Sequence, residues 1–302
     1  MSSDSARHES PIAVVAALVA NLAIAAAKFA AALLTGSSAM FAEGIHSLVD
    51  SSNEVVLLVG ERRSSRPPDD LHQFGHGKEI YFWTLVVAVL LFAIGGGLAF
   101  YEGLIHFLDP HPIDNVVASY VVLAISFALE AASSYVAIRE LEPRGVNLWR
   151  AMLQTKDASV LAVLVENAAA MVGLIVAFLG LVAAEVTGDT RFDALGSLAV
   201  GVVLTSVAVF LAGESRALLI GESAPGPLLD QARQIIESDP AVAAIRSLRS
   251  MHLGPDHVVI TARVSFKPGR KNDAAVIAAL KLRLAQADPL FNDMTIEPAA
   301  DD

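Results

Sequence analysis

The first two thirds of the chain alternate between long apolar stretches and short polar segments. The apolar stretches run over residues 11–34, 39–59, 80–107, 116–138, 158–183 and 192–211. A helix of about 20 apolar residues is long enough to cross the hydrocarbon layer of a membrane. We therefore predict a polytopic α-helical membrane protein with six transmembrane helices.

The pattern changes near residue 219, where shorter amphipathic segments replace the long apolar ones. They read as a helix, two strands joined by a turn, a second helix and a third strand, over residues 225–238, 244–252, 257–266, 272–286 and 291–297. This order predicts a small α+β domain of the ferredoxin-like class, with its helices on one face of the sheet. We expect a six-helix transmembrane domain at 1–218 and a cytoplasmic C-terminal domain at 219–302. Because the second domain is small, dimerisation would help it to bury its surfaces.

Lysine and arginine are concentrated in two of the polar segments. The segment after the second apolar stretch carries Arg62, Arg63, Arg66 and Lys78. The segment after the fourth carries Arg139, Arg144, Arg150 and Lys156. Basic loops stay on the cytoplasmic side of a membrane. We therefore expect both basic loops and both termini to face the cytosol.

Composition narrows the class of protein further. The formal net charge is −11, which argues against nucleic acid as a partner because no basic face is present. The chain contains no cysteine, which excludes thiolate metal sites, disulfides and thiol redox chemistry. Residues 1–10 resemble neither an amphipathic presequence nor a signal peptide, so we interpret Pro11 as the start of a true first span. We expect a multi-pass protein of the plasma (inner) membrane of a bacterium.

Four polar residues share one face of the second apolar stretch. Glu43, His46, Asp50 and Asn53 are three or four residues apart, which places them along one side of a helix. A charged residue within a membrane span costs roughly 2.5–3.5 kcal/mol on insertion scales, so such a residue indicates function. A neutral imidazole nitrogen beside a carboxylate oxygen is half of a site for a first-row divalent metal. The alternative is a polar pair that fixes the packing between helices.

Three motifs carry a resemblance to a known family. The second stretch reads GSSAMFAEGIHSLVDSSN over residues 36–53, FGHGKE precedes the third stretch at 74–79, and YEG lies near its end at 101–103. These motifs resemble those of the cation diffusion facilitators, and the pattern of residues 42–53 is similar to the branch around zinc transporter nine. The resemblance implies a homodimer that exports a divalent metal cation from the cytosol in exchange for protons, by alternating access.

The fifth stretch departs from the family pattern. Most members carry a histidine four residues before a carboxylate there, and the resemblance places Ala162 at the histidine position and Glu166 at the carboxylate position. One nitrogen ligand is therefore missing, as it is in the zinc transporter nine branch. We expect the metal to bind His46, Asp50 and Glu166, with Asn53 or water completing the shell.

The expected function is that of a secondary transporter and not an enzyme, with the metal as cargo and no cofactor. Metal binding needs neutral imidazole and ionised carboxylates, so protons compete with the metal for the same atoms. Zinc is the expected cargo, with manganese, iron or cobalt as alternatives because the missing histidine makes the site richer in oxygen. The rival functions are a non-transporting membrane metal sensor or scaffold, and an exchanger of organic cations.

Other polar residues in the apolar stretches leave more than one role open. Lys28 could reach the membrane surface or pair with an acid. Glu130, near the middle of the fourth stretch, could make an interhelical contact or relay protons. Asn167 offers a carbonyl oxygen but points about 100° away from Glu166 on an ideal helix. Asp157 is either an entry carboxylate or a helix cap.

Histidines outside the central site give weaker signals. His106 lies four residues after Glu102, which indicates an interfacial pair more than a weak exit site. His72 and His76 stand among Asp69 and Asp70 in a basic loop, where solvation competes with metal binding. In the C-terminal domain His252 and His257 flank the strand turn, and the third strand has no histidine. We expect no complete regulatory metal site there.

Overall fold

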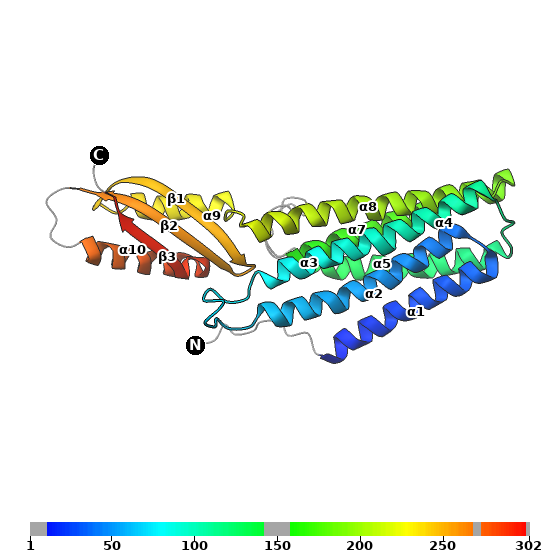
Figure 1. Ribbon diagram of the computed structural model, residues 1–302, viewed down its shortest axis with the longest axis horizontal. Helices are drawn as coiled ribbons and strands as arrows, with labels where there is room; N and C mark the ends of the chain where they lie inside the picture. Colours follow the sequence, from blue (N-terminus) through cyan, green and yellow to red (C-terminus); the bar gives the residue numbers. More distant parts are fainter. Residues whose placement is uncertain (1–10, 142–157, 268–272, 300–302) are drawn as a thin grey trace. The chain divides into compact units, whose positions relative to one another are not determined.

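The computed structural model describes residues 11–141, 158–267 and 273–299, which form a helical bundle and a small sheet domain (Figure 1). The described chain falls into two compact units. The first contains the chain up to Val59 and most of the chain between Trp83 and Gly213. The second contains the Gly60–Phe82 segment and the chain from Glu214 onward.

The predicted apolar stretches are all helical. Their helices are α1 (Pro11–Thr35), α2 (Ser38–Ser64), α3 (Glu79–Leu90), η1 (Leu91–Gly96), α4 (Gly97–Leu108), α5 (Val116–Leu141), α7 (Ala158–Thr187) and α8 (Arg191–Ile220). The third predicted helix is a run of α3, η1 and α4, in which η1 is π-helical. The expected boundaries agree with the observed ones except at the C-terminal ends of α2 and α8, which extend further.

Four helices in the described part of the chain are long and apolar enough to cross a membrane. They span Glu79–Leu108, Val116–Tyr135, Leu161–Thr187 and Arg191–Ile220. The Asn21–Thr35 part of α1 is apolar but shorter. Helix α2 carries Glu43, Asp50 and Glu54 along its length, which lowers its hydropathy. A multi-pass membrane domain is therefore confirmed, whereas the number of six spans stays a prediction.

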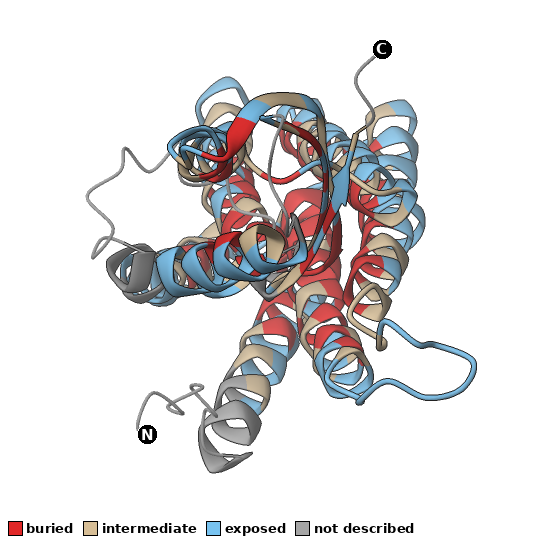
Figure 2. Cartoon of the chain, turned by 90° about the vertical axis from the view of Figure 1, so that its left-hand side faces the viewer, coloured by how far each residue is buried: buried red, intermediate tan, exposed pale blue. Residues whose placement is uncertain are grey.

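Buried residues in the bundle gather where the helices face one another (Figure 2). One apolar cluster joins α2, α3, η1, α4, α7 and α8, and another joins α1, α2, α5 and α7. Both clusters include residues of α2, so the polar face of this helix is held within the bundle. Gly96 and Gly201 allow η1 and α8 to approach closely, since a Cβ at Gly201 would lie 3.1 Å from the Gly96 carbonyl oxygen.

The N-terminus of α2 is held by a carboxylate from α8. Asp193 accepts a hydrogen bond from the Ser37 hydroxyl at 2.6 Å, from the Ser38 backbone N–H at 2.7 Å and from the Ala39 backbone N–H at 3.3 Å. The first N–H groups of a helix have no partner within the helix, and a negative charge there is favourable. This cap fixes the position of α2 relative to α8.

The C-terminal domain has the predicted α-β-β-α-β order. Its elements are α9 (Gly226–Glu237), β1 (Val242–Gly254), β2 (His257–Phe266), α10 (Asp273–Ala287), the short 3₁₀ turn η3 (Pro289–Asn292) and β3 (Asp293–Pro298). Strand β2 lies between β1, which is antiparallel to it, and β3, which is parallel. Alternate residues of β2 share one buried cluster with α9 and α10, so both helices cover the same face of the sheet, as expected.

Candidate metal site

The polar face predicted on α2 is buried. Glu43 and Asn53 are 0% exposed, and His46 is 1% exposed. The Asp50 side chain is 21% exposed. The four residues follow one side of the helix, as their spacing predicts. Buried polar groups of this kind are stable only if they find partners or a ligand.

His46 lacks the partners that a buried histidine normally has. Neither of its ring nitrogens makes a hydrogen bond with a described residue. Its Nδ1 atom lies 3.5 Å from Asp50 Oδ1, which is also buried and without a hydrogen bond. An unsatisfied buried polar group typically costs about 1–3 kcal/mol. A nitrogen and an oxygen held side by side, neither hydrogen-bonded to a described residue, are suited to sharing a cation.

Asn53 connects the polar face of α2 to α7. Its Nδ2 atom donates a hydrogen bond of 2.8 Å to Glu166 Oε1, and Glu166 is 7% exposed. The structure therefore brings Glu166 to the same part of the bundle as His46 and Asp50, which the sequence separates by more than 100 residues. In this arrangement the Asn53 amide orients the carboxylate of Glu166.

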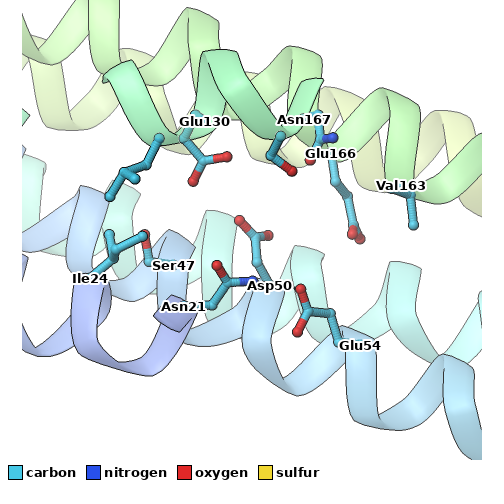
Figure 3. A pocket seen from close by; sticks show the side chains of 11 residues that line it. Asn21, Ile24, Ser47, Asp50, Glu54, Glu130, Val163, Glu166 and Asn167 are labelled. Carbon is cyan, nitrogen blue, oxygen red and sulfur yellow. Dashed lines mark hydrogen bonds between the residues drawn. The ribbon is translucent and has the colours of Figure 1, made fainter. Parts of the chain in front are cut away.

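A cavity of about 120 Å³ opens beside these residues between α1, α2, α5 and α7. Its wall carries four carboxylates, from Asp50, Glu54, Glu130 and Glu166. Figure 3 shows the carboxylates of Asp50 and Glu130 pointing into the space between their helices from opposite sides. The remaining polar lining comes from Asn21, Ser47, Ser133 and Asn167. His46 and Asn53 do not line the cavity and lie behind its wall.

Asn167 lies closer to the site than the helix geometry suggested. It lines the same cavity as Glu166 and Asp50, and Figure 3 shows its side chain directed toward that space. The angle of about 100° between adjacent residues of a helix did not separate them, because the cavity extends along the face of α7 that carries both. The amide of Asn167 is therefore available to a cation or its water shell.

Lys28 has an acidic partner inside the bundle. Its Nζ atom lies 3.0 Å from Glu43 Oε2 and 2.8 Å from Ser47 Oγ, and both Lys28 and Glu43 are 0% exposed. Of the two roles considered for Lys28, the structure shows the ion pair. Because Glu43 is neutralised by this lysine, its charge is not free to hold a second cation.

The position of the missing histidine is apolar. Ala162 is 0% exposed and belongs to the cluster that includes Ile45, Val49 and Leu57. It offers no donor atom to a metal. The ligands of a site at His46, Asp50 and Glu166 must therefore be completed by residues on other helices or by water.

Sequence reasoning missed the pair formed by Asn21 and Glu54. Asn21 Nδ2 donates a hydrogen bond of 2.5 Å to Glu54 Oε1, which links α1 to α2 at the cavity wall. The available signal was the spacing, because Glu54 lies four residues after Asp50 and continues the same helix face. The cavity is therefore more acidic than the predicted set of ligands implied.

In the described part of the chain, the one group of three potential metal ligands whose atoms come together lies in the loop between α2 and α3, whereas His46, Asp50 and Glu166 do not come together as closely. One ligand atom from each of Asp69, His72 and His76 lies within 4.8 Å of the others, as metal binding requires. Asp69 Oδ2 is 3.1 Å from His76 Nε2, and Asp69 Oδ1 accepts the His72 backbone N–H at 2.6 Å. The backbone hydrogen bond from His72, followed by the hydrogen bond with His76, lowers the pKa of Asp69 to about 2. The loop thus holds an ionised carboxylate beside two imidazoles.

The other predicted polar pairs each join one histidine to one carboxylate. His106 Nε2 lies 3.4 Å from Glu102 Oε1 in α4, and both side chains are about a quarter exposed. His257 lies 3.1 Å from Asp293 at the start of β3. In the described part of the C-terminal domain, no group of three potential metal ligands comes together. Asp157 and the basic loop at Arg144, Arg150 and Lys156 lie outside the described residues.

Comparison with known proteins agrees with the architecture of the bundle. Residues 14–220 match the family described as the cation efflux transmembrane domain. The chain is 34% identical over 279 residues to "Proton-coupled zinc antiporter SLC30A9, mitochondrial" from Xenopus laevis, covering 91% of this chain and 49% of that protein. It is 31% identical over 258 residues to "Metal tolerance protein C4" from Arabidopsis thaliana, covering 84% of this chain and 56% of that protein.

A bacterial relative is more distant. The chain is 25% identical over 245 residues to "Manganese efflux system protein MneP" from Bacillus subtilis, covering 79% of this chain and 78% of that protein. By contrast, the chain spans about half the length of the SLC30A9 relatives it matches. Because those relatives are described as mitochondrial, the expectation of a bacterial plasma membrane is not supported.

The family match covers more than half of the chain and coincides with the helices that carry the polar site. Members of this family move metal ions and are not enzymes, and the SLC30A9 relatives agree with the predicted branch. This chain belongs to the cation efflux (cation diffusion facilitator) family, in its zinc transporter nine-like branch.

Proposed function

We propose that this chain exports a divalent metal cation from the cytosol in exchange for protons, with zinc as the main cargo and manganese, iron or cobalt as alternatives. The observation that carries the proposal is the buried His46, whose ring nitrogens have no hydrogen bond among the described residues and which lies 3.5 Å from Asp50. The SLC30A9 relatives, which are named as proton-coupled zinc antiporters, support it.

The proposed cargo site consists of His46, Asp50 and Glu166, with Asn53 positioned to hold Glu166. The 2.8 Å hydrogen bond from Asn53 supports this assignment, because it orients the carboxylate of α7 beside α2. Protons and metal compete for the same nitrogen and oxygen atoms. An acidic compartment on the far side would therefore favour protonation and release of the metal, whereas the cytosolic side would favour reloading.

The proposed architecture places six spans in residues 1–218 and a cytoplasmic ferredoxin-like domain in residues 219–302, with both termini in the cytosol and two copies per transporter. The basic residues of the loop between α2 and α3 support this orientation. The small size of the sheet domain supports dimerisation.

The test is metal uptake by purified protein in sealed vesicles, with Asp50→Asn as the variant. We expect this variant to lose transport, because the substitution removes the anionic oxygen beside His46 while keeping the side-chain size. Ser52→Ala is the matched control, since Ser52 is exposed on the same helix and its hydroxyl bonds only to the Leu48 carbonyl. Wild-type uptake by Asp50→Asn would remove this residue from the site.

The same assay separates the rival functions. A metal sensor or scaffold would bind metal without carrying it into the vesicles. An exchanger of organic cations would carry those cations and would be insensitive to Asp50→Asn. A scaffold would use the polar face for packing alone, whereas His46 and Asp50 Oδ1 make no hydrogen bond to described residues.

A further inference from the structure

The two halves of α1 are held to the bundle in different ways. In the C-terminal half, Ala31 and Ala32 belong to an apolar cluster shared with α2, α5 and α7, and Lys28 forms the buried ion pair with Glu43. Of the described side chains at residues 18–27, none belongs to the apolar clusters of the bundle. A segment with few buried apolar contacts opens more easily than a packed one. The N-terminal half of α1, residues 18–27, is therefore the part of this helix that is free to move.

A hydrogen bond joins this N-terminal half to α2. Asn21 Nδ2 lies 2.5 Å from Glu54 Oε1, and both side chains are partly buried at the wall of the cavity. Figure 3 shows the two residues beside Asp50. Among the described residues that line the cavity, they are the pair from different helices that a hydrogen bond connects. The contact therefore bridges the α1 and α2 walls of the cavity.

This contact lies between Asp50 and one end of the bundle. Glu54 follows Asp50 by four residues, or about 6 Å along the helix axis, in the direction of the C-terminal end of α2. That end carries Arg62 and Arg63 and faces the cytosol in the proposed orientation. A cation that reaches Asp50 from the cytosol along this wall of the cavity therefore passes the Asn21–Glu54 contact.

The opposite end of the bundle is tied at more places. The Asp114 backbone N–H donates a hydrogen bond of 2.8 Å to the Thr35 carbonyl, which joins the end of α1 to the start of α5. The Tyr120 hydroxyl donates one of 2.6 Å to Glu185, between α5 and α7. Asp193 holds the start of α2 on α8. In the described part of the bundle, fewer polar contacts therefore close the cytosolic side of the cavity than the far side.

We propose that the N-terminal half of α1 closes the cytosolic side of the cargo cavity, and that Asn21 is the positioning residue that holds it closed through Glu54. This inference rests on the proposed transport of a divalent metal. A carrier that exchanges metal for protons at one site exposes that site to each side in turn. The Asn21–Glu54 bond parts to admit the cation and forms again behind it. The ion pair of Lys28 with Glu43 stays intact and keeps the C-terminal half of α1 in place.

The absence of cysteine from the chain allows a direct test. Asn21→Cys and Glu54→Cys are introduced together into the full-length protein in sealed vesicles, and the pair is linked by a short, reducible bifunctional thiol reagent. We expect the link to stop zinc uptake and reductant to restore it, because the two helices can no longer part. A contact that serves packing alone stays closed throughout transport. Undiminished uptake by the linked pair would therefore overturn the proposal.

Phe29→Cys with Phe41→Cys is the matched control pair. The centroids of these two rings lie 5.5 Å apart, so the same reagent links the same two helices at the C-terminal half of α1. We expect zinc uptake to continue after this link, because this half of the helix stays in place. Loss of uptake in both linked pairs would show that α1 moves as a whole, which overturns the assignment to its N-terminal half.

A second measurement decides the case if the cysteine pairs fail to fold. Asn21→Leu keeps the shape of the side chain and removes its hydrogen-bond donor. We expect the rate constants of Zn²⁺ binding and release, followed by stopped-flow fluorescence of a chelator, both to rise by about tenfold, the factor that corresponds to one hydrogen bond to a charged group. The affinity is the ratio of these two constants and should change less.

Val19→Ala is the control for these rates, since Val19 is 60% exposed on the same half of α1. It should leave both rate constants unchanged. Unchanged rate constants for Asn21→Leu, or a fall in affinity without a rise in both constants, would overturn the role of Asn21.

Failure of this inference can be told from failure of the proposed function. If the wild-type protein carries zinc into vesicles and Asp50→Asn does not, then uptake by the linked pair at positions 21 and 54 overturns the role of the N-terminal half of α1 alone. If the wild-type protein carries no divalent metal, the proposed function itself is wrong.

Discussion

The ammonium of Lys28 lies 3.0 Å from the carboxylate of Glu43, and neither side chain is exposed. The pair connects α1 to α2 three residues before His46. Among the described residues Glu43 Oε1 has no hydrogen-bond partner, and it lies beside Gly173 of α7, where an added Cβ would be 2.6 Å away. The ion pair and the glycine together allow α1, α2 and α7 to meet beside the proposed metal site.

Removing one partner of this ion pair should destabilise the protein. We expect Lys28→Met to lower the free energy of unfolding by about 3–5 kcal/mol, because it leaves a buried carboxylate without its cation. The double variant Lys28→Met with Glu43→Gln should recover much of that loss, since it removes both charges. Thermal unfolding in detergent measures the stabilities of the wild type, of Lys28→Met and Glu43→Gln singly, and of the double variant. A double variant as unstable as the sum of the single variants would contradict the pairing.

Asn53→Ala should weaken metal binding without removing a ligand. It deletes the 2.8 Å hydrogen bond to Glu166, and loss of a residue that orients a metal ligand typically costs about 10–100-fold in affinity. Glu166→Ala should be more severe because it removes an anionic donor. The two variants are compared by Zn²⁺ competition binding. Equal affinities for Asn53→Ala and wild type would show that Glu166 is held in place by other contacts.

Ala162→His should raise the ratio of zinc to manganese uptake in vesicles, because it adds an imidazole to a shell rich in oxygen. The structure indicates that this substitution also lowers the stability of the fold. Ala162 is fully buried among apolar side chains, and overpacking a core usually destabilises by about 1–3 kcal/mol. Ala162→Leu is the control, since it fills the same space without a donor. An unchanged ratio for the histidine variant would place the site away from Ala162.

The loop between α2 and α3 should be stable to acid. Asp69 has its pKa lowered from 3.8 to about 2, mainly by the hydrogen bond from the His72 backbone. A carboxylate with a lowered pKa stabilises the folded loop above its unfolded value of 3.8, and this contribution is lost as the pH falls through about 2. The NMR chemical shifts of the Leu71 and His72 amides should change between pH 3.8 and about 2. A transition above pH 4 would contradict the hydrogen bonds.

The transporter should be a homodimer. A sheet domain of residues 219–302 is too small to bury a large core by itself, and a second copy would cover part of its surface. Mass measurement of the full-length protein in a mild detergent, at several concentrations, tests the prediction. A mass of one chain at every concentration would count against it.

Most of the fold follows from patterns that are local in the sequence. The apolar stretches predicted the helices of the bundle within a few residues, because a membrane helix satisfies its own backbone hydrogen bonds. The alternation of apolar and polar residues along 257–266 predicted β2. Alternate residues of this strand are buried beneath α9 and α10. The length of α2 and α8 beyond the apolar stretches was missed, because charged residues at 61–63 and at 214–216 interrupt the apolar pattern.

The sequence by itself determined which residues of α2 share a face, because the 3.6-residue period of a helix sets that relationship without any neighbour. Only the tertiary structure decided which groups meet across helices: Asn53 with Glu166, Lys28 with Glu43, and Glu130 with Asp50 around one cavity. These pairings depend on how the helices rotate and pack against one another. That packing is determined by apolar clusters from many segments and by close contacts such as Gly96 with Gly201, which no single stretch of sequence contains.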